Sequence, residues 1–133
     1  MNVVRSLSRP MVAAMFVYGG FDALRHPDPK VPRAKIVTDP ITDLLPVDDT
    51  DAVDIVLLNG AVQVGAGLTL ALGVLPRLSA MLLAASLIPT TAAGHRFWEE
   101  TDQRARSQQT IHFLKNVSML GGLLAVATAP RLR

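Results

Sequence analysis

The sequence contains no cysteine among its 133 residues. This absence excludes disulfides, thiolate zinc sites, cysteine nucleophiles and iron–sulfur clusters held by this chain alone. Aromatic residues make up only 5% of the chain, and the net charge is only +2, without a basic tract. A nucleic-acid-binding surface needs clustered basic residues interleaved with aromatics, so nucleic acid is excluded as a partner as well.

Charged residues are also scarce: they make up 18% of the chain, whereas hydrophobic residues make up 50%. Soluble domains usually carry about a quarter charged residues. The longest uncharged runs are the 22 residues 55–76 and the 18 residues 78–95. A membrane span needs about 20 mostly apolar residues. The two adjacent runs therefore predict two transmembrane helices joined by a very tight turn at Pro76-Arg77.

Two shorter uncharged runs lie between Arg9 and Asp22 and between Lys115 and Arg131. Arg9 and Lys115 can extend their charged ends toward the headgroups while their aliphatic stems stay in lipid, which lengthens both spans. The sequence thus predicts an all-α integral membrane protein, a four-helix transmembrane bundle that forms one domain over residues 1–133. The predicted helices cover about 5–25, 54–75, 77–96 and 111–130. A cleaved signal peptide at the N-terminus and a soluble four-helix bundle are the less favoured alternatives.

The segment 26–53 between the first two predicted spans is long and contains five prolines, which predicts a proline-rich loop. Residues 38–45 within it could form a short interfacial helix. Four spans would place both termini on one side, and the short segments on that side carry five basic residues and no acidic one. The opposite side carries eight basic residues by raw count, but these are spread over longer loops. Because the positive-inside rule counts Lys and Arg near span ends, we expect both termini in the cytoplasm.

Polar side chains inside the predicted spans need an explanation, because placing them in a bilayer costs free energy. Asn59 and Gln63 lie one turn apart on one face, and Asn116 follows Lys115. Hydrogen bonds between helices are the favoured interpretation. The alternative is a polar-lined pocket for a lipid head group, a quinone or a small solute.

The three histidines all map to the membrane side opposite the termini. Asp22 precedes His26 by four residues, and Glu99 follows His95 by four. In a four-helix bundle, His26, His95, His112, Asp22 and Glu99 could form one cluster. Such a cluster could bind a divalent metal or haem iron, or relay protons to a quinone. Interfacial histidines bonded to loop backbone or carboxylates are the favoured interpretation, so no metal site is predicted. No serine or carboxylate set forms a catalytic signature, and we expect the chain not to be catalytic by itself.

Glycines recur within the predicted spans, and we expect them to allow close helix packing. They are Gly19, Gly20, Gly60, Gly65, Gly67, Gly73, Gly121 and Gly122.

Several short motifs in a fixed order carry a resemblance to a known family. They are Arg5-Ser6-Leu7-Ser8-Arg9-Pro10-Met11, Phe16-Val17-Tyr18-Gly19-Gly20-Phe21-Asp22, Leu58-Asn59-Gly60-Ala61-Val62-Gln63, Pro76-Arg77-Leu78, Gly94-His95-Arg96-Phe97-Trp98 and His112-Phe113-Leu114-Lys115-Asn116. Together they resemble the DoxX family of small four-span bacterial membrane proteins, in its actinobacterial form. The resemblance implies a four-helix bundle in the plasma membrane. It supplies no catalytic residues, and the long proline-rich first loop departs from shorter members.

The family takes its name from a subunit of an archaeal thiosulfate:quinone oxidoreductase. Some mycobacterial relatives are linked to a membrane complex with superoxide dismutase and a sulfurtransferase-like protein in resistance to oxidative stress. The resemblance therefore implies an accessory or anchor subunit of a membrane redox complex, with a redox enzyme as partner. A quinone- or haem-binding electron-transfer subunit, or small membrane oxidoreductase, is the second hypothesis. A carrier of lipid or small solutes is the third. Membrane lipid and a second copy of the chain are further expected partners.

Overall fold

Five α-helices and two short 3-10 turns make up the computed structural model, which describes residues 3–44 and 50–130. In chain order they are α1 (Val3–Arg25), η1 (Asp28–Lys30), α2 (Val31–Thr42), α3 (Thr50–Leu72), α4 (Pro76–Gly94), η2 (Phe97–Glu99) and α5 (Gln103–Thr128). Within the described ranges there is no β-strand, so the expected all-α class is confirmed.

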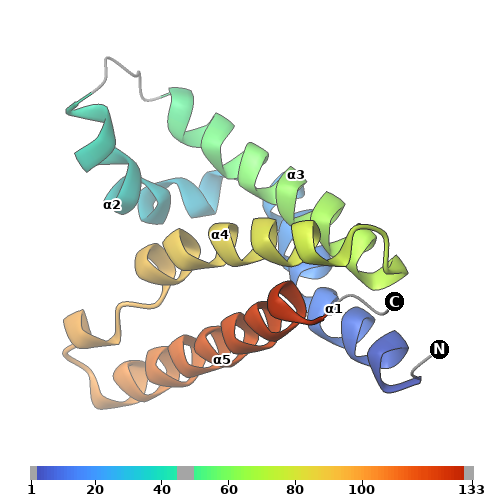
Figure 1. Cartoon of the computed structure of the whole chain (residues 1–133). Helices are drawn as coiled ribbons and strands as arrows, with labels where there is room; N and C mark the ends of the chain where they lie inside the picture. Colours follow the sequence, from blue (N-terminus) through green and yellow to red (C-terminus); the bar gives the residue numbers. More distant parts are fainter. Residues whose placement is uncertain (1–2, 45–49, 131–133) are drawn as a thin grey trace.

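The four long helices run alternately up and down the bundle (Figure 1). Asn59 near the start of α3 lies beside Thr90 near the end of α4, and Thr69 near the end of α3 bonds to Ser79 near the start of α4, so these two helices are antiparallel. Asn116 of α5 bonds to Thr91 of α4. At one end, Arg77 donates a hydrogen bond to the carbonyl of Ala129, and the Arg9 guanidinium lies against Gly73. The start of α1, the turn between α3 and α4 and the end of α5 therefore share one end of the bundle.

The predicted tight turn is present. Between the end of α3 at Leu72 and the start of α4 at Pro76, Gly73 and Leu75 take positive φ values of 73° and 47°. Pro76 occupies the first position of α4, where its missing N–H would have no helical partner in any case.

The expected proline-rich loop is wrong for residues 28–42, which form η1 and α2. Pro32 stands in the first turn of α2, where the absence of an N–H costs no helical hydrogen bond. Pro40 comes only two residues before the helix ends at Thr42. A helix does lie near the expected position 38–45, but it begins at Val31, and residue 45 lies outside the described ranges. The last helix also begins earlier than expected, at Gln103, where the Asp102 side chain accepts a hydrogen bond from the Ala105 N–H as its N-cap.

The core lies where α1, α3, α4 and α5 meet, and four of its nine buried members are alanine. Its buried members are Ala13, Phe16, Ala66, Leu70, Ala80, Leu83, Ala84, Leu87 and Leu123. Alanine at so many of these positions lets the helix backbones approach closely, as is usual for helices that pack in a membrane.

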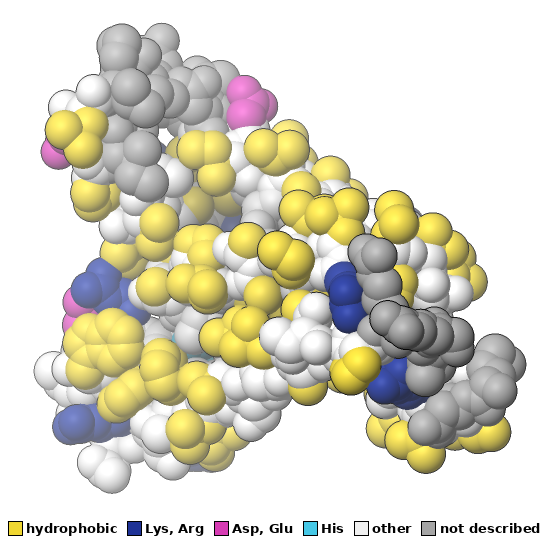
Figure 2. All heavy atoms as spheres, viewed as in Figure 1, with side chains coloured by type: hydrophobic (Ala, Val, Ile, Leu, Met, Phe, Trp, Pro, Cys, Tyr) yellow, Lys and Arg dark blue, Asp and Glu magenta, His cyan; other side chains and the backbone are white. Residues whose placement is uncertain are grey.

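Three of the helical segments in the described ranges are long and apolar enough to cross a membrane, namely residues 52–72, 76–99 and 103–128. α1 is 23 residues long but is not among them, so the fourth span stays a prediction. Large apolar side chains on α3, α4 and α5 are exposed, and Figure 2 shows them spread over the visible surface of these helices. This distribution fits contact with lipid tails.

The helix glycines differ in how closely they pack. A Cβ on Gly67 would lie 2.8 Å from Val17, and Gly20 and Gly60 are equally crowded. Nothing comes within 4 Å of such an atom on Gly65 or Gly121, so the expectation of close packing is wrong at those two positions.

Candidate functional site

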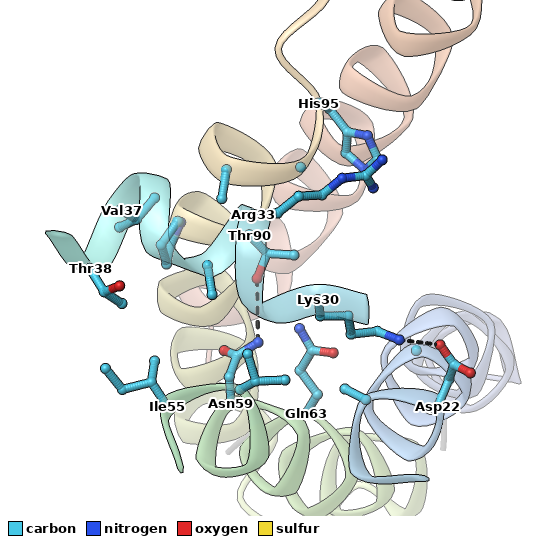
Figure 3. A pocket seen from close by; sticks show the side chains of 17 residues that line it. Asp22, Lys30, Arg33, Val37, Thr38, Ile55, Asn59, Gln63, Thr90 and His95 are labelled. Atoms are coloured by element: carbon cyan, nitrogen blue, oxygen red, sulfur yellow. Dashed lines mark hydrogen bonds and ion pairs between the residues drawn. The ribbon is translucent and has the colours of Figure 1, made fainter. Parts of the chain in front are cut away.

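A cavity of about 340 Å³ lies between α1, α2, α3 and α4 (Figure 3). This volume is near the lower end of the range for small-molecule sites, about 300–1,000 Å³. The walls are largely apolar, and the polar lining residues are Asp22, Lys30, Arg33, Thr38, Asn59, Gln63, Thr90 and His95.

One end of the cavity is formed by a hydrogen-bonded group of side chains from α3 and α4. The Gln63 amide donates to the Ser86 hydroxyl at 3.0 Å, and that hydroxyl donates to the Asn59 carbonyl oxygen at 2.7 Å. The Asn59 amide also lies 3.4 Å from the Thr90 hydroxyl. Gln63 and Ser86 are buried, so their polar atoms need these partners. We call Asn59, Gln63, Ser86 and Thr90 the amide group.

Figure 3 shows Arg33 and His95 together at the other end, whereas Lys30 points away from them toward Asp22 on α1. The Lys30 ammonium lies 2.6 Å from the Asp22 carboxylate. Arg33 makes no hydrogen bond or ion pair with any residue in the described ranges. The cavity lining thus holds two permanent cations and one carboxylate, which favours an electron-rich or anionic ligand group near Arg33.

His95 connects the cavity to α5. Its Nδ1 lies 2.9 Å from the Gln109 side-chain oxygen, and its ring stacks on the ring of His112 at a centroid distance of 5.2 Å. Arg33 and Lys115 are close enough to interact with His95 electrostatically. Because Nδ1 is bonded to Gln109, the other ring nitrogen is the one left for a ligand.

The predicted polar residues divide into two pairs. Asn59 and Gln63 line the cavity. Asn116 does not; it is buried between α4 and α5, where its amide donates to the Thr91 hydroxyl at 3.0 Å. Lys115 does not line the cavity either.

The five-residue histidine cluster also separates into smaller groups. His26 lies 3.3 Å from Asp22 on α1, as the spacing of four residues predicts, while His95 pairs with His112. Glu99 does not share a helix face with His95, because α4 ends at Gly94; it pairs with Arg96 at 2.7 Å. No group of three or more His, Cys, Asp or Glu residues able to hold a metal ion occurs in the described ranges.

Sequence reasoning missed Lys30 and Arg33 as cavity residues, because the segment that carries them was expected to be a loop. The signal that could have found them is the helical spacing of Ala34, Val37 and Thr38, which all line the cavity from one face of α2.

A model of the DoxX family matches residues 4–96, which is most of the chain and includes α1 to α4. The chain belongs to the DoxX family. The match covers every residue that lines the cavity, whereas α5 lies beyond it. No curated protein and no solved structure matched this DoxX protein significantly.

Proposed function

We propose that this DoxX protein is a quinone-binding membrane subunit that serves a redox enzyme. The observation that carries the proposal is the distribution of polar groups in the cavity. Hydrogen-bond donors stand at two ends, the amide group at one and Arg33 at the other (Figure 3). The walls between them come from apolar residues such as Ala23, Val56 and Ala93.

A quinone ring has the matching chemistry. It is flat and apolar on its faces, and it carries an acceptor oxygen at each of two opposite ends. A phospholipid has only one polar end, so it would leave either the amide group or the cationic end without a ligand partner. Buried donors without partners cost free energy, so a ligand that reaches both ends is favoured.

Each end can supply donors without losing its structural bonds. The amides of Asn59 and Gln63 each have a second N–H besides the one bonded to Thr90 or Ser86. At the other end, the Arg33 guanidinium is available as a donor. The second ring nitrogen of His95 is an acceptor, because Nδ1 carries the proton that is donated to Gln109, so it can accept a hydrogen bond from the hydroxyl of the reduced quinol. These residues would bind and orient the ring, and the bound quinone would supply the electron-accepting chemistry.

A partner enzyme enters the proposal for a chemical reason. The chain has no cysteine and so offers no thiol redox relay of its own. We therefore assign binding to this protein and electron delivery to a partner, in line with the accessory role that the family resemblance implies.

The test is equilibrium binding of a short-chain menaquinone to the protein in mild detergent. We expect Asn59→Leu and Arg33→Gln each to weaken binding about tenfold, the effect of losing one hydrogen bond of roughly 1.4 kcal/mol. The matched control is Asn116→Leu, which removes a polar side chain that does not line the cavity. Equal weakening by Asn116→Leu, or retention of a phospholipid in the cavity with no quinone binding, would overturn the proposal.

A further inference from the structure

A second, smaller cavity of about 140 Å³ lies beside the first, where α2 meets the end of α4 and the start of α5. It is lined by Arg33, Ile36, Ala93, Gly94, Arg96, Glu99, Glu100 and Gln109. Unlike the larger cavity, it is surrounded mainly by charged and amide side chains. Both cavities share Arg33, Ala93 and Gly94.

Arg96 in this cavity has an unmet hydrogen-bonding need. One of its terminal nitrogens bonds to Glu99 at 2.7 Å, but its Nε is buried and makes no hydrogen bond with any described residue. Because this Nε is enclosed by protein atoms, a ligand reaches Arg96 through its terminal N–H groups, where Glu99 occupies only one nitrogen.

The cavity is lined by equal numbers of positively and negatively charged side chains. Two guanidiniums, of Arg33 and Arg96, face two carboxylates, of Glu99 and Glu100. Only Arg96 and Glu99 pair with each other. Within the described part of the chain, the side chains of Arg33 and Glu100 make no hydrogen bond or ion pair, so one cation and one anion remain for a ligand.

The cavity lies at the depth of lipid headgroups. The third apolar segment that could span the membrane begins at 103 and the second ends at 99, so the cavity is at the boundary of both. Phe97, Trp98 and Phe113 form a cluster of edge-to-face rings there, with centroids 5.2–6.2 Å apart. Tryptophan favours the membrane–water interface.

We propose that this second cavity binds the zwitterionic phosphoethanolamine headgroup of a phospholipid. The phosphate oxygens accept hydrogen bonds from the terminal N–H groups of Arg96 and from Arg33, and the primary ammonium donates to Glu100. Arginine recognises phosphate well because its N–H groups are fixed in a fork. A phosphocholine headgroup has no N–H to donate to a carboxylate, and a phosphoglycerol headgroup brings an anion without the cation that Glu100 requires.

This proposal does not depend on quinone binding. Arg33 lines both cavities and is therefore left unchanged in the test, whereas Arg96 and Glu100 line only the second. Arg104 provides the matched control, because it is an exposed arginine on the nearby first turn of α5 and lines neither cavity.

The experiment is native mass spectrometry of the protein released from nanodiscs that contain equal amounts of phosphatidylethanolamine, phosphatidylglycerol and phosphatidylcholine. The wild-type protein is expected to retain phosphatidylethanolamine at least fivefold over either other lipid. Arg96→Gln should lower the retained phosphatidylethanolamine about tenfold, and Arg104→Gln should leave it unchanged. Glu100→Gln should remove the preference over phosphatidylglycerol while phosphate binding persists.

Equal retention of the three lipids by the wild-type protein would overturn the proposed headgroup site. This measurement uses the wild-type protein alone, so it does not depend on whether a variant folds. A wild-type preference for phosphatidylglycerol would overturn the ethanolamine assignment. The same loss in Arg104→Gln as in Arg96→Gln would show that general surface charge, and not this cavity, holds the lipid.

Discussion

Gly20 of α1 and Gly60 of α3 each face the backbone carbonyl of the other. A Cβ placed on Gly20 would lie 2.7 Å from the Gly60 oxygen, and one placed on Gly60 would lie 2.9 Å from the Gly20 oxygen. This reciprocal contact packs α1 against α3 at Gly60. In the sequence, Gly60 is one residue from Asn59 and three residues from Gln63. The absence of a side chain at two positions thus brings the helix with Asp22 close to the amide group and closes one wall of the larger cavity.

Gly60→Ala should therefore destabilise the protein. The added methyl group meets a backbone oxygen and cannot be relieved by a side-chain rotation, so we expect a loss of about 1–3 kcal/mol, typical of overpacking. Thermal unfolding in detergent would measure it. Gly65→Ala is the control, because the space around Gly65 is open and alanine is the better helix former. Equal melting temperatures for the two variants would contradict the packing described for α1.

Ser86 is the residue that joins Asn59 and Gln63, and Ser86→Ala should uncouple them. The buried Gln63 amide would lose its acceptor, at a cost of about 1 kcal/mol, since hydrogen bonds between membrane helices average somewhat below this value. Ser118→Ala offers a comparison, because its exposed hydroxyl bonds only to the Leu114 carbonyl of its own helix. Unfolding midpoints that fall equally in both variants would argue against a special role for Ser86.

The ends of α3 and α4 follow closely from the sequence, because the uncharged runs between Asp54, Arg77 and Arg96 reflect a physical limit on charge in lipid. The predicted spans 54–75 and 77–96 differ from α3 and α4 by only a few residues. The pair Asp22 and His26 could also be read from its spacing within one helix.

Contacts between helices could not be read in the same way. The partners of Asn59 and Gln63 depend on the relative register of α3 and α4, which no local pattern encodes. The helix α2 could not be predicted from the sequence because of its prolines. Proline disfavours a helix interior, but it is tolerated in the first turn, where Pro32 lies. As a consequence the two cations that line the cavity, Lys30 and Arg33, emerged only from the structure.

Asn116 and Thr91 should be energetically coupled across α4 and α5. The Asn116 amide donates to the Thr91 hydroxyl, which itself donates to the Leu87 carbonyl at 2.7 Å. In a double-mutant cycle with Asn116→Leu and Thr91→Val, we expect a coupling energy of about 0.5–1.5 kcal/mol. Unfolding free energies of the four proteins supply the cycle. Strict additivity would mean that the contact contributes no net stability.

The placement of the chain in the membrane can be tested directly, because the protein has no cysteine to remove. Ser6 and Val74 lie at the end of the bundle shared by the start of α1 and the turn between α3 and α4, whereas Asp28 and Arg104 lie on segments at the opposite end. If α1 is the fourth span and both termini are cytoplasmic, single cysteines at 28 and 104 should react with a membrane-impermeant maleimide in intact cells. Cysteines at 6 and 74 should react only after the cells are opened. Labelling of residue 6 from outside, with residue 74 protected, would mean that α1 does not cross the membrane, and labelling of both from outside would reverse the orientation of the whole bundle.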